Sequence, residues 1–227
     1  MQEYFKSLSQ KLEGELELDD LHKKLYATDA SVYKMLPLAV AYPKNSKDLK
    51  LLIQFAKKHN TSLIPRTAGT SLAGQCVGEG IVVDVSKHFT KIIELNTQEN
   101  TVRVQPGVNR DALNAYLKPF NLFFGPNTST SAYCMMGGMV GNNSSGTTSI
   151  RYGVTRDQVV ELETILSDGS HVIFKTLNNE EFIDKTEESS LEGRIYAYFY
   201  QTLSDKAVQQ EILQEFPEAS VHRRNTG

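Results

Sequence analysis

Residues 125–148 read GPNTSTSAYCMMGGMVGNNSSGTT, a run of small, polar and glycine residues that any fold of this chain must accommodate. A loop of this length without structure of its own is usually functional or disordered. Disorder is a poor description, because the run also holds apolar side chains that linkers lack: Tyr133, Met135, Met136, Met139 and Val140. We therefore expect a folded stretch whose backbone is approached closely. A polar, multi-ring ligand with phosphates explains that approach, and so does tight packing of glycine against a neighbouring strand.

A second run of small residues, IPRTAGTSLAGQ at 64–75, directly follows an expected strand. Gly69 and Gly74 can adopt positive φ without strain, and successive backbone N–H groups in such a loop form a concave anion-binding nest. Hydroxyl donors and one positive charge add to this character: Thr67, Thr70, Ser71 and Arg66. A strand-to-turn loop with polar filling explains the same residues, so both interpretations stay open from the residues alone.

Composition limits the class of protein. The chain has 227 residues, of which 40% are hydrophobic and 22% charged, with a net charge of −3. This size supports a real core in one domain or two small ones. The charge balance has no basic stripe, so nucleic acid is not an expected partner. The sequence contains no stretch of about 18 apolar residues that would span a membrane. Cys76 and Cys134 have no metal-ligand spacing, and the acidic first 20 residues lack the apolar centre of a signal peptide, so we expect a cytoplasmic protein.

The pattern of apolar residues predicts a mixed α+β fold. In NSKDLKLLIQFAKKHN (45–60), apolar residues recur at helical spacing and Ser46 is expected to cap the helix. Asn109 is expected to cap a helix that stops before Pro119, and Asp168-Gly169 predicts a hairpin turn. The remaining expected elements are helical segments at 1–27 with a break near Gly14, strands at 61–67 and 80–86, a hairpin of 91–96 with 101–107, a hairpin within 159–174, and helix over 190–215.

Several well-known motifs are missing from the sequence. It has no G-x-G-x-x-G after a strand, no G-x-x-x-x-G-K-[ST] and no G-x-S-x-G, which argues against Rossmann, P-loop and serine-hydrolase sites. The five histidines are scattered without ligand spacing, so we expect no metal site: His22, His59, His88, His171 and His222.

Three segments taken together resemble a known family. PRTAGTSLAGQ, VQPGVNRDALNAYL and the long run from FFGPNTSTSAYCMMGGMVGNNSSG to ETILSDGS follow one another as they do in the FAD-linked oxidases. The resemblance implies the FAD-binding domain of the vanillyl-alcohol oxidase and p-cresol methylhydroxylase type, with two small α/β subdomains. Within that family the chain is most similar to the D-lactate, glycolate and D-2-hydroxyglutarate dehydrogenase branch. The likeness covers residues 29 to about 175, and DASVYKMLPLAVAYPKNSKDL (29–49) resembles the start of that branch.

The resemblance implies an FAD site built from both glycine-rich stretches. The first would cradle the pyrophosphate through Arg66, Thr67, Ala68, Gly69, Thr70 and Ser71. The second would line the flavin and ribityl chain through Ser131, Cys134, Gly137, Gly138, Asn142, Asn143 and Gly146. The two stretches must then converge in space, because one extended dinucleotide touches both.

This chain departs from the family pattern at the first stretch. The usual R-G-G-G-T reads Arg66-Thr67-Ala68-Gly69-Thr70 here, so two glycines are replaced by small residues. Some relatives place a histidine that bonds covalently to the flavin where this chain has Thr70. We therefore expect non-covalent FAD.

The end of the chain is the other departure. VHRRNTG (221–227) resembles the opening of a family motif that continues into further FAD-contacting strands. We expect an N-terminal helical extension over 1–28 and an FAD-binding domain over 29–227 that is incomplete at its C-terminal end. The catalytic residues are then unknown and lie outside this chain, and the fragment alone is expected to be inactive. An iron–sulfur cluster is expected, if present, in the missing C-terminal region.

The resemblance implies a flavoprotein dehydrogenase that oxidises a D-2-hydroxy acid to the 2-oxo acid by hydride transfer to flavin. The implied partners are the small hydroxy acid and an electron acceptor, either an iron–sulfur domain or a quinone. Two alternatives remain. One is a non-catalytic nucleotide- or phosphate-binding module. The other is a flavin reductase of the same fold, which the run from Asn142 to Gly146 argues against.

Overall fold

The computed structural model of the protein describes residues 2–216, 218, 220 and 221. The described residues up to Gln158 form one compact unit, and those from Val159 onward form a second. The family motif expected at 221–227 lies, apart from Val221, outside the described residues.

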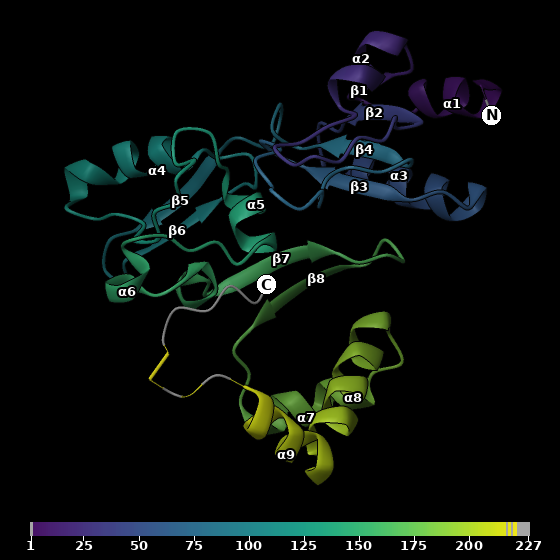
Figure 1. Ribbon diagram of the computed structural model, residues 1–227. Coiled ribbons are helices and arrows are strands. Elements are labelled where there is room, and N and C mark those ends of the chain that lie inside the picture. Colours follow the sequence, from purple (N-terminus) through teal and green to yellow (C-terminus); the bar gives the residue numbers. More distant parts are fainter. Residues whose placement is uncertain (1, 217, 219, 222–227) are drawn as a thin grey trace. The chain divides into compact units, whose positions relative to one another are not determined.

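The first unit begins with a four-stranded sheet in the order β1-β2-β4-β3 (Figure 1). The strands are β1 (Glu15–Glu17), β2 (Ala39–Tyr42), β3 (Leu63–Arg66) and β4 (Ile81–Asp84). β2, β4 and β3 are parallel, whereas β1 is antiparallel to β2. All four residues of β4 are buried, as are the first three of β2, which is the apolar pattern of parallel strands covered on both faces.

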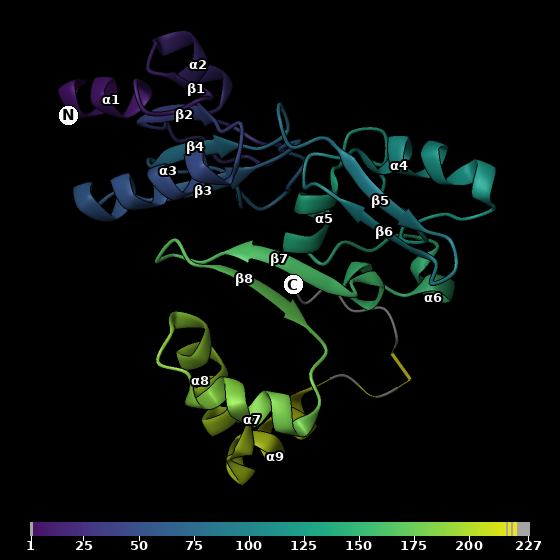
Figure 2. The same cartoon turned by 180° about the vertical axis from the view of Figure 1, so that it is seen from behind.

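Helix α3 (Ser46–His59) connects β2 to β3 and packs on the sheet; Figures 1 and 2 both show it running beside β3. Leu52 and Phe55 of α3 join Ile81 and Val83 of β4 in one apolar cluster. The prediction that Ser46 caps this helix is wrong. Asn45 caps the helix instead, since its backbone is extended and its side chain accepts the N–H of Asp48 at 3.0 Å, whereas Ser46 is already helical.

The N-terminal segment differs from the expected helical piece. It contains α1 (Gln2–Ser9) and α2 (Asp20–Leu25), but β1 lies between them and pairs with β2. The prediction of helix is therefore wrong at Glu15–Glu17. The reason is long-range: the Asp48 carboxylate accepts the N–H groups of Glu13 and Gly14, both at 2.9 Å, and this fixes the turn that leads into β1.

The second part of the first unit is built on a hairpin. β5 (Ile92–Asn96) pairs antiparallel with β6 (Thr101–Val104), as expected, and Asn100 in the turn has φ +55°. Asn109 caps α4 (Arg110–Leu117), also as expected, and a 3-10 turn, η1 (Lys118–Phe120), extends it. The chain then forms α5 (Met136–Gly141), α6 (Ser149–Tyr152) and the 3-10 turn η2 (Thr155–Gln158). Their core is a cluster of Val108, Leu113, Leu117, Cys134, Met136 and Met139.

The second unit consists of a hairpin and three helices. β7 (Glu161–Ile165) and β8 (His171–Lys175) pair antiparallel across the expected turn, where Gly169 has φ +86°. The expected helix over 190–215 is two helices, α8 (Leu191–Ser204) and α9 (Lys206–Glu215), because Asp205 leaves the helical conformation and caps α9. A further helix, α7 (Asn179–Glu187), was not predicted.

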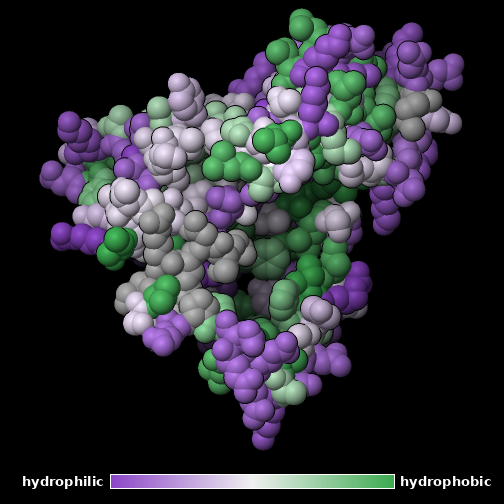
Figure 3. All heavy atoms as spheres, in the orientation of Figure 1, coloured by the Kyte–Doolittle hydropathy of each residue, from purple (hydrophilic) through white to green (hydrophobic). Residues whose placement is uncertain are grey.

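The helices of the second unit bury little. Within the described part of the chain, no residue of α7 or α9 is buried, and Gly193 alone is buried in α8. Hydrophilic residues cover the tip of this helical group on the side shown in Figure 3. Tyr198, Phe199 and Leu213 are exposed.

Candidate functional site

The first glycine-rich stretch begins where β3 ends. Residues 66–76 leave the carboxyl end of a parallel strand, which is the edge at which open α/β sheets bind their ligands. Gly69 has φ +66° and Gly74 has φ +75°, a backbone conformation that favours glycine. The backbone conformation is therefore the one expected of a tight, nest-like loop.

Arg66 lies back against its own loop. Its Nη1 donates to the carbonyl of Thr28 at 2.8 Å, and its Cζ lies 5.0 Å from the ring centroid of Tyr26. A Cβ at Gly69 would overlap the guanidinium group. The positive charge is thus held beside Gly69, at the entrance to the loop.

Tyr26 is itself fixed from the sheet. Its hydroxyl donates to Asp84 Oδ2 at 2.6 Å, and Asp84 is the buried last residue of β4. Burial raises the pKa of Tyr26, and the hydrogen bond to Asp84 raises that pKa further. The tyrosine therefore stays neutral and acts as a fixed donor beneath Arg66.

Ser71 donates its hydroxyl to Asp29 Oδ2 at 2.6 Å, and the buried thiol of Cys76 lies 3.4 Å from the Ser71 oxygen. Burial acts to raise the pKa of Asp29, but the hydrogen bonds from Ser31 and Ser71 outweigh it and lower the pKa to about 2. An ionised carboxylate therefore holds the middle of the loop. Asp29 was not among the residues predicted for the site.

The glycines of the second stretch divide into two kinds. A Cβ at Gly137 would lie 2.6 Å from the Cβ of Pro106, and one at Gly146 would overlap the carbonyl oxygen of Asn127. These two glycines are required by packing within the protein. At Gly141 no described atom outside the local helix lies within 4 Å of such a Cβ, and at Gly138 the neighbour is Thr67 Oγ1 at 2.7 Å. Gly141 therefore has open space beside it, whereas Gly138 lies close against the Thr67 side chain of the first stretch.

The two stretches meet, as expected, although about 60 residues separate them. Gly138 of α5 faces Thr67 of the first loop, and Gln75 Nε2 donates to Asn142 Oδ1 at 3.4 Å. Both contacts lie within the first unit. A single ligand at this junction would touch both backbones.

Some predicted site residues do not lie where the two stretches meet. Cys134 is 5% exposed, with its sulfur 3.2 Å from Thr128 Oγ1 and 3.6 Å from Met139 Sδ. Asn143 is buried, has φ +42°, and accepts the N–H of Arg156 at 2.9 Å. These two buried residues therefore support the conformation of the second stretch through contacts inside the protein. Ser131 is partly exposed and its hydroxyl lies 3.3 Å from Asp111 Oδ2.

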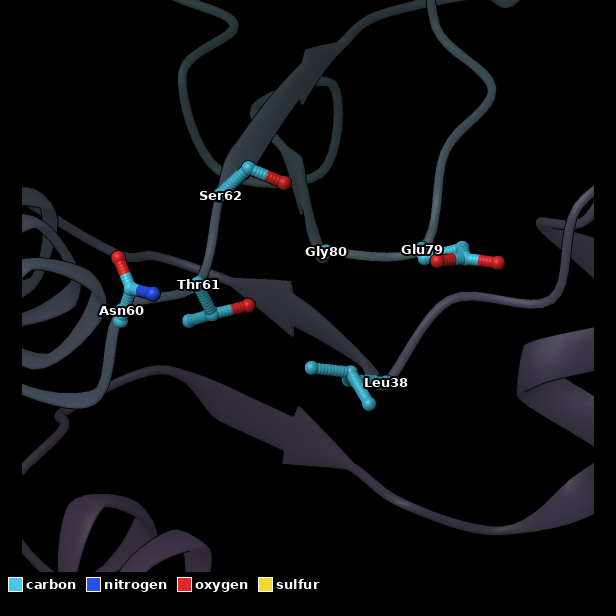
Figure 4. Close-up of a pocket in the computed structure, with 6 residues that line it drawn as sticks. All are labelled: Leu38, Asn60, Thr61, Ser62, Glu79 and Gly80. Carbon is cyan, nitrogen blue, oxygen red and sulfur yellow. The ribbon is translucent and has the colours of Figure 1, made fainter.

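A shallow pocket lies at the other end of the parallel strands, where β2, β3 and β4 begin. It has a volume of about 530 Å³, and Figure 4 shows its lining from three segments that each precede a strand: Leu38, Asn60, Thr61, Ser62, Glu79 and Gly80. These residues lie at the amino ends of β2, β3 and β4, away from the glycine-rich loops. Because open sheets of parallel strands bind ligands at the carboxyl ends of the strands, the loops and not this pocket are the candidate site.

One histidine has carboxylate neighbours that the sequence spacing did not suggest. Ligand-type atoms of Glu17, Asp19 and His22 lie within 4.8 Å of one another, and His22 Nδ1 lies 2.6 Å from Asp19 Oδ2. The group lies on the surface around α2.

Among the described residues, no helix is both long and apolar enough to cross a membrane.

Comparison with known proteins gives a family match for most of this region. The model of the FAD binding domain family matches residues 37–175. D-2-hydroxyglutarate dehydrogenase of Escherichia coli (strain K12) is 39% identical over 194 residues, which are 84% of this chain and 19% of that protein. The mitochondrial cytochrome-type D-lactate dehydrogenase of Kluyveromyces lactis is 36% identical over 140 residues, which are 60% of this chain and 24% of that protein. The chain thus spans about a fifth of the length of the D-2-hydroxyglutarate dehydrogenase it matches.

Solved structures share the fold at lower identity. An alkyldihydroxyacetonephosphate synthase superposes with a TM-score of 0.69 at 20% identity, covering 79% of this chain and 35% of that one. p-Cresol methylhydroxylase with bound substrate gives a TM-score of 0.65 at 17% identity, covering 76% of this chain and 36% of that one. The expected fold type is therefore confirmed.

Proposed function

The chain belongs to the FAD binding domain family, and from that premise we propose that it is the FAD-binding portion of a longer flavoprotein dehydrogenase that oxidises a D-2-hydroxy acid to the 2-oxo acid. The similar dehydrogenases for D-2-hydroxyglutarate and D-lactate support this substrate class. They act on different hydroxy acids, so the proposal stops at the class.

The meeting of the two glycine-rich stretches carries the proposal. Gly138 and Thr67 approach each other so closely that a Cβ on the glycine would lie 2.7 Å from the threonine hydroxyl. The junction offers backbone groups and neutral hydroxyl and amide side chains, with the Arg66 charge beside Gly69. Such a donor set fits a pyrophosphate and a ring system that must be held without being hydrolysed.

The two stretches would bind different parts of the FAD. Residues 66–71 would hold the pyrophosphate, with backbone N–H groups and the Thr67 and Thr70 hydroxyls as donors. Gly138 and Asn142 would line the ring and ribityl chain, where the absence of a Cβ on Gly138 lets Thr67 of the first stretch come close. Gly137, Gly146, Cys134 and Asn143 would support that surface from behind. When bound, FAD supplies the hydride acceptor, while the protein supplies position and electrostatics.

We further propose that the FAD is held non-covalently, because Thr70 replaces the histidine through which some relatives bond covalently to the flavin. The base that removes the hydroxyl proton and the groups that bind the substrate carboxylate are proposed to lie in the rest of the longer protein. The electron acceptor is proposed to be an iron–sulfur centre of that protein or a quinone.

The proposal is tested by an ultraviolet–visible spectrum of the purified full-length protein, followed by an assay of its reduction by D-2-hydroxy acids. We expect the oxidised-flavin absorbance at about 450 nm, release of the flavin on denaturation, and bleaching by a D-2-hydroxy acid. D-2-hydroxyglutarate, D-lactate and glycolate should be compared. Flavin that stays attached after denaturation would contradict the non-covalent proposal. A protein that binds nucleotides but no flavin would support the binding-module alternative, and bleaching by NADH or NADPH but by no hydroxy acid would support the reductase alternative.

A further inference from the structure

The segment before β2 reaches back to the first glycine-rich loop. Residues 26–31 contact it at several points: the Tyr26 ring with Arg66, the Thr28 carbonyl with Arg66 Nη1, the Ala30 N–H with the Gly69 carbonyl at 3.2 Å, and the Asp29 carboxylate with Ser71 and Cys76. We call residues 26–31 the brace. From these contacts we infer that Asp29 is a positioning residue that sets the shape of the pyrophosphate loop through Ser71. The inference rests on the proposed function.

Asp29 is the part of the brace that reaches the middle of the loop. Its Oδ1 accepts the N–H of Ser31 at 2.8 Å, which fixes the carboxylate within its own turn. Its Oδ2 accepts the Ser71 hydroxyl at 2.6 Å and lies 3.7 Å from the Cys76 sulfur. A charge-assisted hydrogen bond of this length is strong, so the loop between Gly69 and Cys76 is tied to a residue about 40 positions earlier.

A carboxylate is not expected to contact a pyrophosphate directly, because like charges repel. The role of Asp29 must therefore be exerted through the loop and not on the ligand. The two possible effects of the charge have opposite signs. If Asp29 positions the loop, its removal weakens FAD binding. If repulsion of the phosphates dominates, its removal strengthens FAD binding.

The buried thiol of Cys76 gives a readout of loop order that needs no cofactor. Cys76 is 7% exposed and lies against both Ser71 and Asp29. The other cysteine, Cys134, is 5% exposed in a separate apolar cluster, so it serves as an internal control. A loop released from Asp29 exposes Cys76 to a thiol reagent and leaves Cys134 unchanged.

The test compares Asp29→Ala, Asp29→Asn, Ser71→Ala and the double variant Asp29→Ala with Ser71→Ala in the full-length protein. Asp184→Ala removes the same charge from exposed helix α7 and is the matched control. FAD affinity is measured by flavin fluorescence on the apoprotein, and Cys76 reactivity by maleimide labelling and peptide mapping. We expect Asp29→Ala and Ser71→Ala each to weaken FAD binding about tenfold, with the double variant no weaker than either.

Asp29→Asn keeps an oxygen for the Ser31 N–H and an amide for Ser71, so it should recover most of the affinity. Labelling of Cys76 should be at least about tenfold faster in Asp29→Ala than in the wild type, with Cys134 unchanged. FAD affinity that is unchanged or tighter in Asp29→Ala, or additive losses in the double variant, would overturn the inference. A wild-type protein that binds no FAD would overturn the proposed function instead, while unchanged Cys76 labelling would show separately that Asp29 does not hold the loop.

Discussion

The two glycine-rich stretches look alike in sequence but are held in different ways. The loop at 66–76 is tied from outside, by Tyr26, Thr28 and Asp29 of the brace. The stretch at 134–146 is held by backbone contacts, since Met136 N–H donates to the Val108 carbonyl at 2.9 Å and Gly137 N–H donates to the Pro106 carbonyl at 2.8 Å.

The glycines in the two stretches also have different physical causes. Gly69 and Gly74 permit positive φ, whereas Gly137 and Gly146 permit close packing of protein against protein. Gly138 permits a close approach of a different kind, because its neighbour is Thr67 of the other stretch. A glycine-rich composition therefore indicates a binding surface only after the packing glycines are separated from the open ones.

The largest expected effect is on folding at a packing glycine. Gly146→Ala would force a methyl group onto the Asn127 carbonyl at a buried position, so the backbone must move. We expect the free energy of unfolding to fall by about 3 kcal/mol or more, measured by chemical denaturation.

Gly141→Ala is the matched control, because it adds the same methyl group at the end of α5 where no described atom outside the helix lies within 4 Å. We expect a change within about 1 kcal/mol, and a stabilising sign is consistent with the higher helix propensity of alanine. Equal destabilisation by both variants would remove the distinction between packing and open glycines.

The second prediction concerns ligand binding at Gly138, the glycine that faces the other stretch. Gly138→Leu should reduce FAD retention of the full-length protein by at least about tenfold, because a Cβ there would lie only 2.7 Å from Thr67 Oγ1 and the larger side chain must push the two stretches apart. Helix α3 and the β7–β8 hairpin should stay folded, which circular dichroism and hydrogen exchange would check. Gly141→Leu provides a control of equal size, and loss of flavin from that variant alone would place the ligand elsewhere on α5.

A smaller effect is expected from the ionisation of Asp29. Its pKa is lowered to about 2 in the folded chain, whereas an unfolded aspartate titrates near about 3.9. The ionised form is therefore favoured by folding, and its contribution is fully present above the unfolded value and lost as the pH falls towards 2. The difference in unfolding free energy between wild type and Asp29→Asn should be constant above about pH 5 and shrink between about pH 4 and pH 2. A difference that grows on acidification would have the wrong sign.

The smallest effect is expected at the side-chain bridge between the stretches. The bond from Gln75 to Asn142 is long, at 3.4 Å, and both residues are exposed. Gln75→Ala should change the free energy of unfolding by less than about 0.5 kcal/mol. A larger loss in thermal denaturation would mean that this bridge, and not the backbone, holds the two stretches together.

The elements predicted correctly from sequence are those specified locally. The cap signal at Asn109 and the turn signal at Asp168-Gly169 depend on residues within a few positions, and each lies where expected. β1 was missed because it is stabilised by Asp48 and β2, both distant in sequence. α5 was missed because glycines at Gly137, Gly138 and Gly141 conceal a helix that packing with the Pro106–Val108 backbone stabilises.

In the candidate site, too, the features with a sequence signal were predicted and those that depend on contacts between distant residues were missed. Family motifs identified both glycine-rich stretches and predicted that they meet, and the Gly138–Thr67 contact agrees with that prediction. The brace was missed, because Asp29 and Ser71 are brought together only by the sheet between them. One local signal was present, since Asp29 followed two residues later by Ser31 forms a turn in which the carboxylate accepts the Ser31 N–H.

The most direct test of the account is amide hydrogen exchange of the full-length protein with FAD bound and after its removal. If one FAD lies at the junction, binding should slow exchange together in residues 66–76 and 136–143 and leave helices α7–α9 unchanged. Protection of only one of the two stretches, or protection centred on the pocket residues Thr61, Ser62 and Glu79, would contradict it.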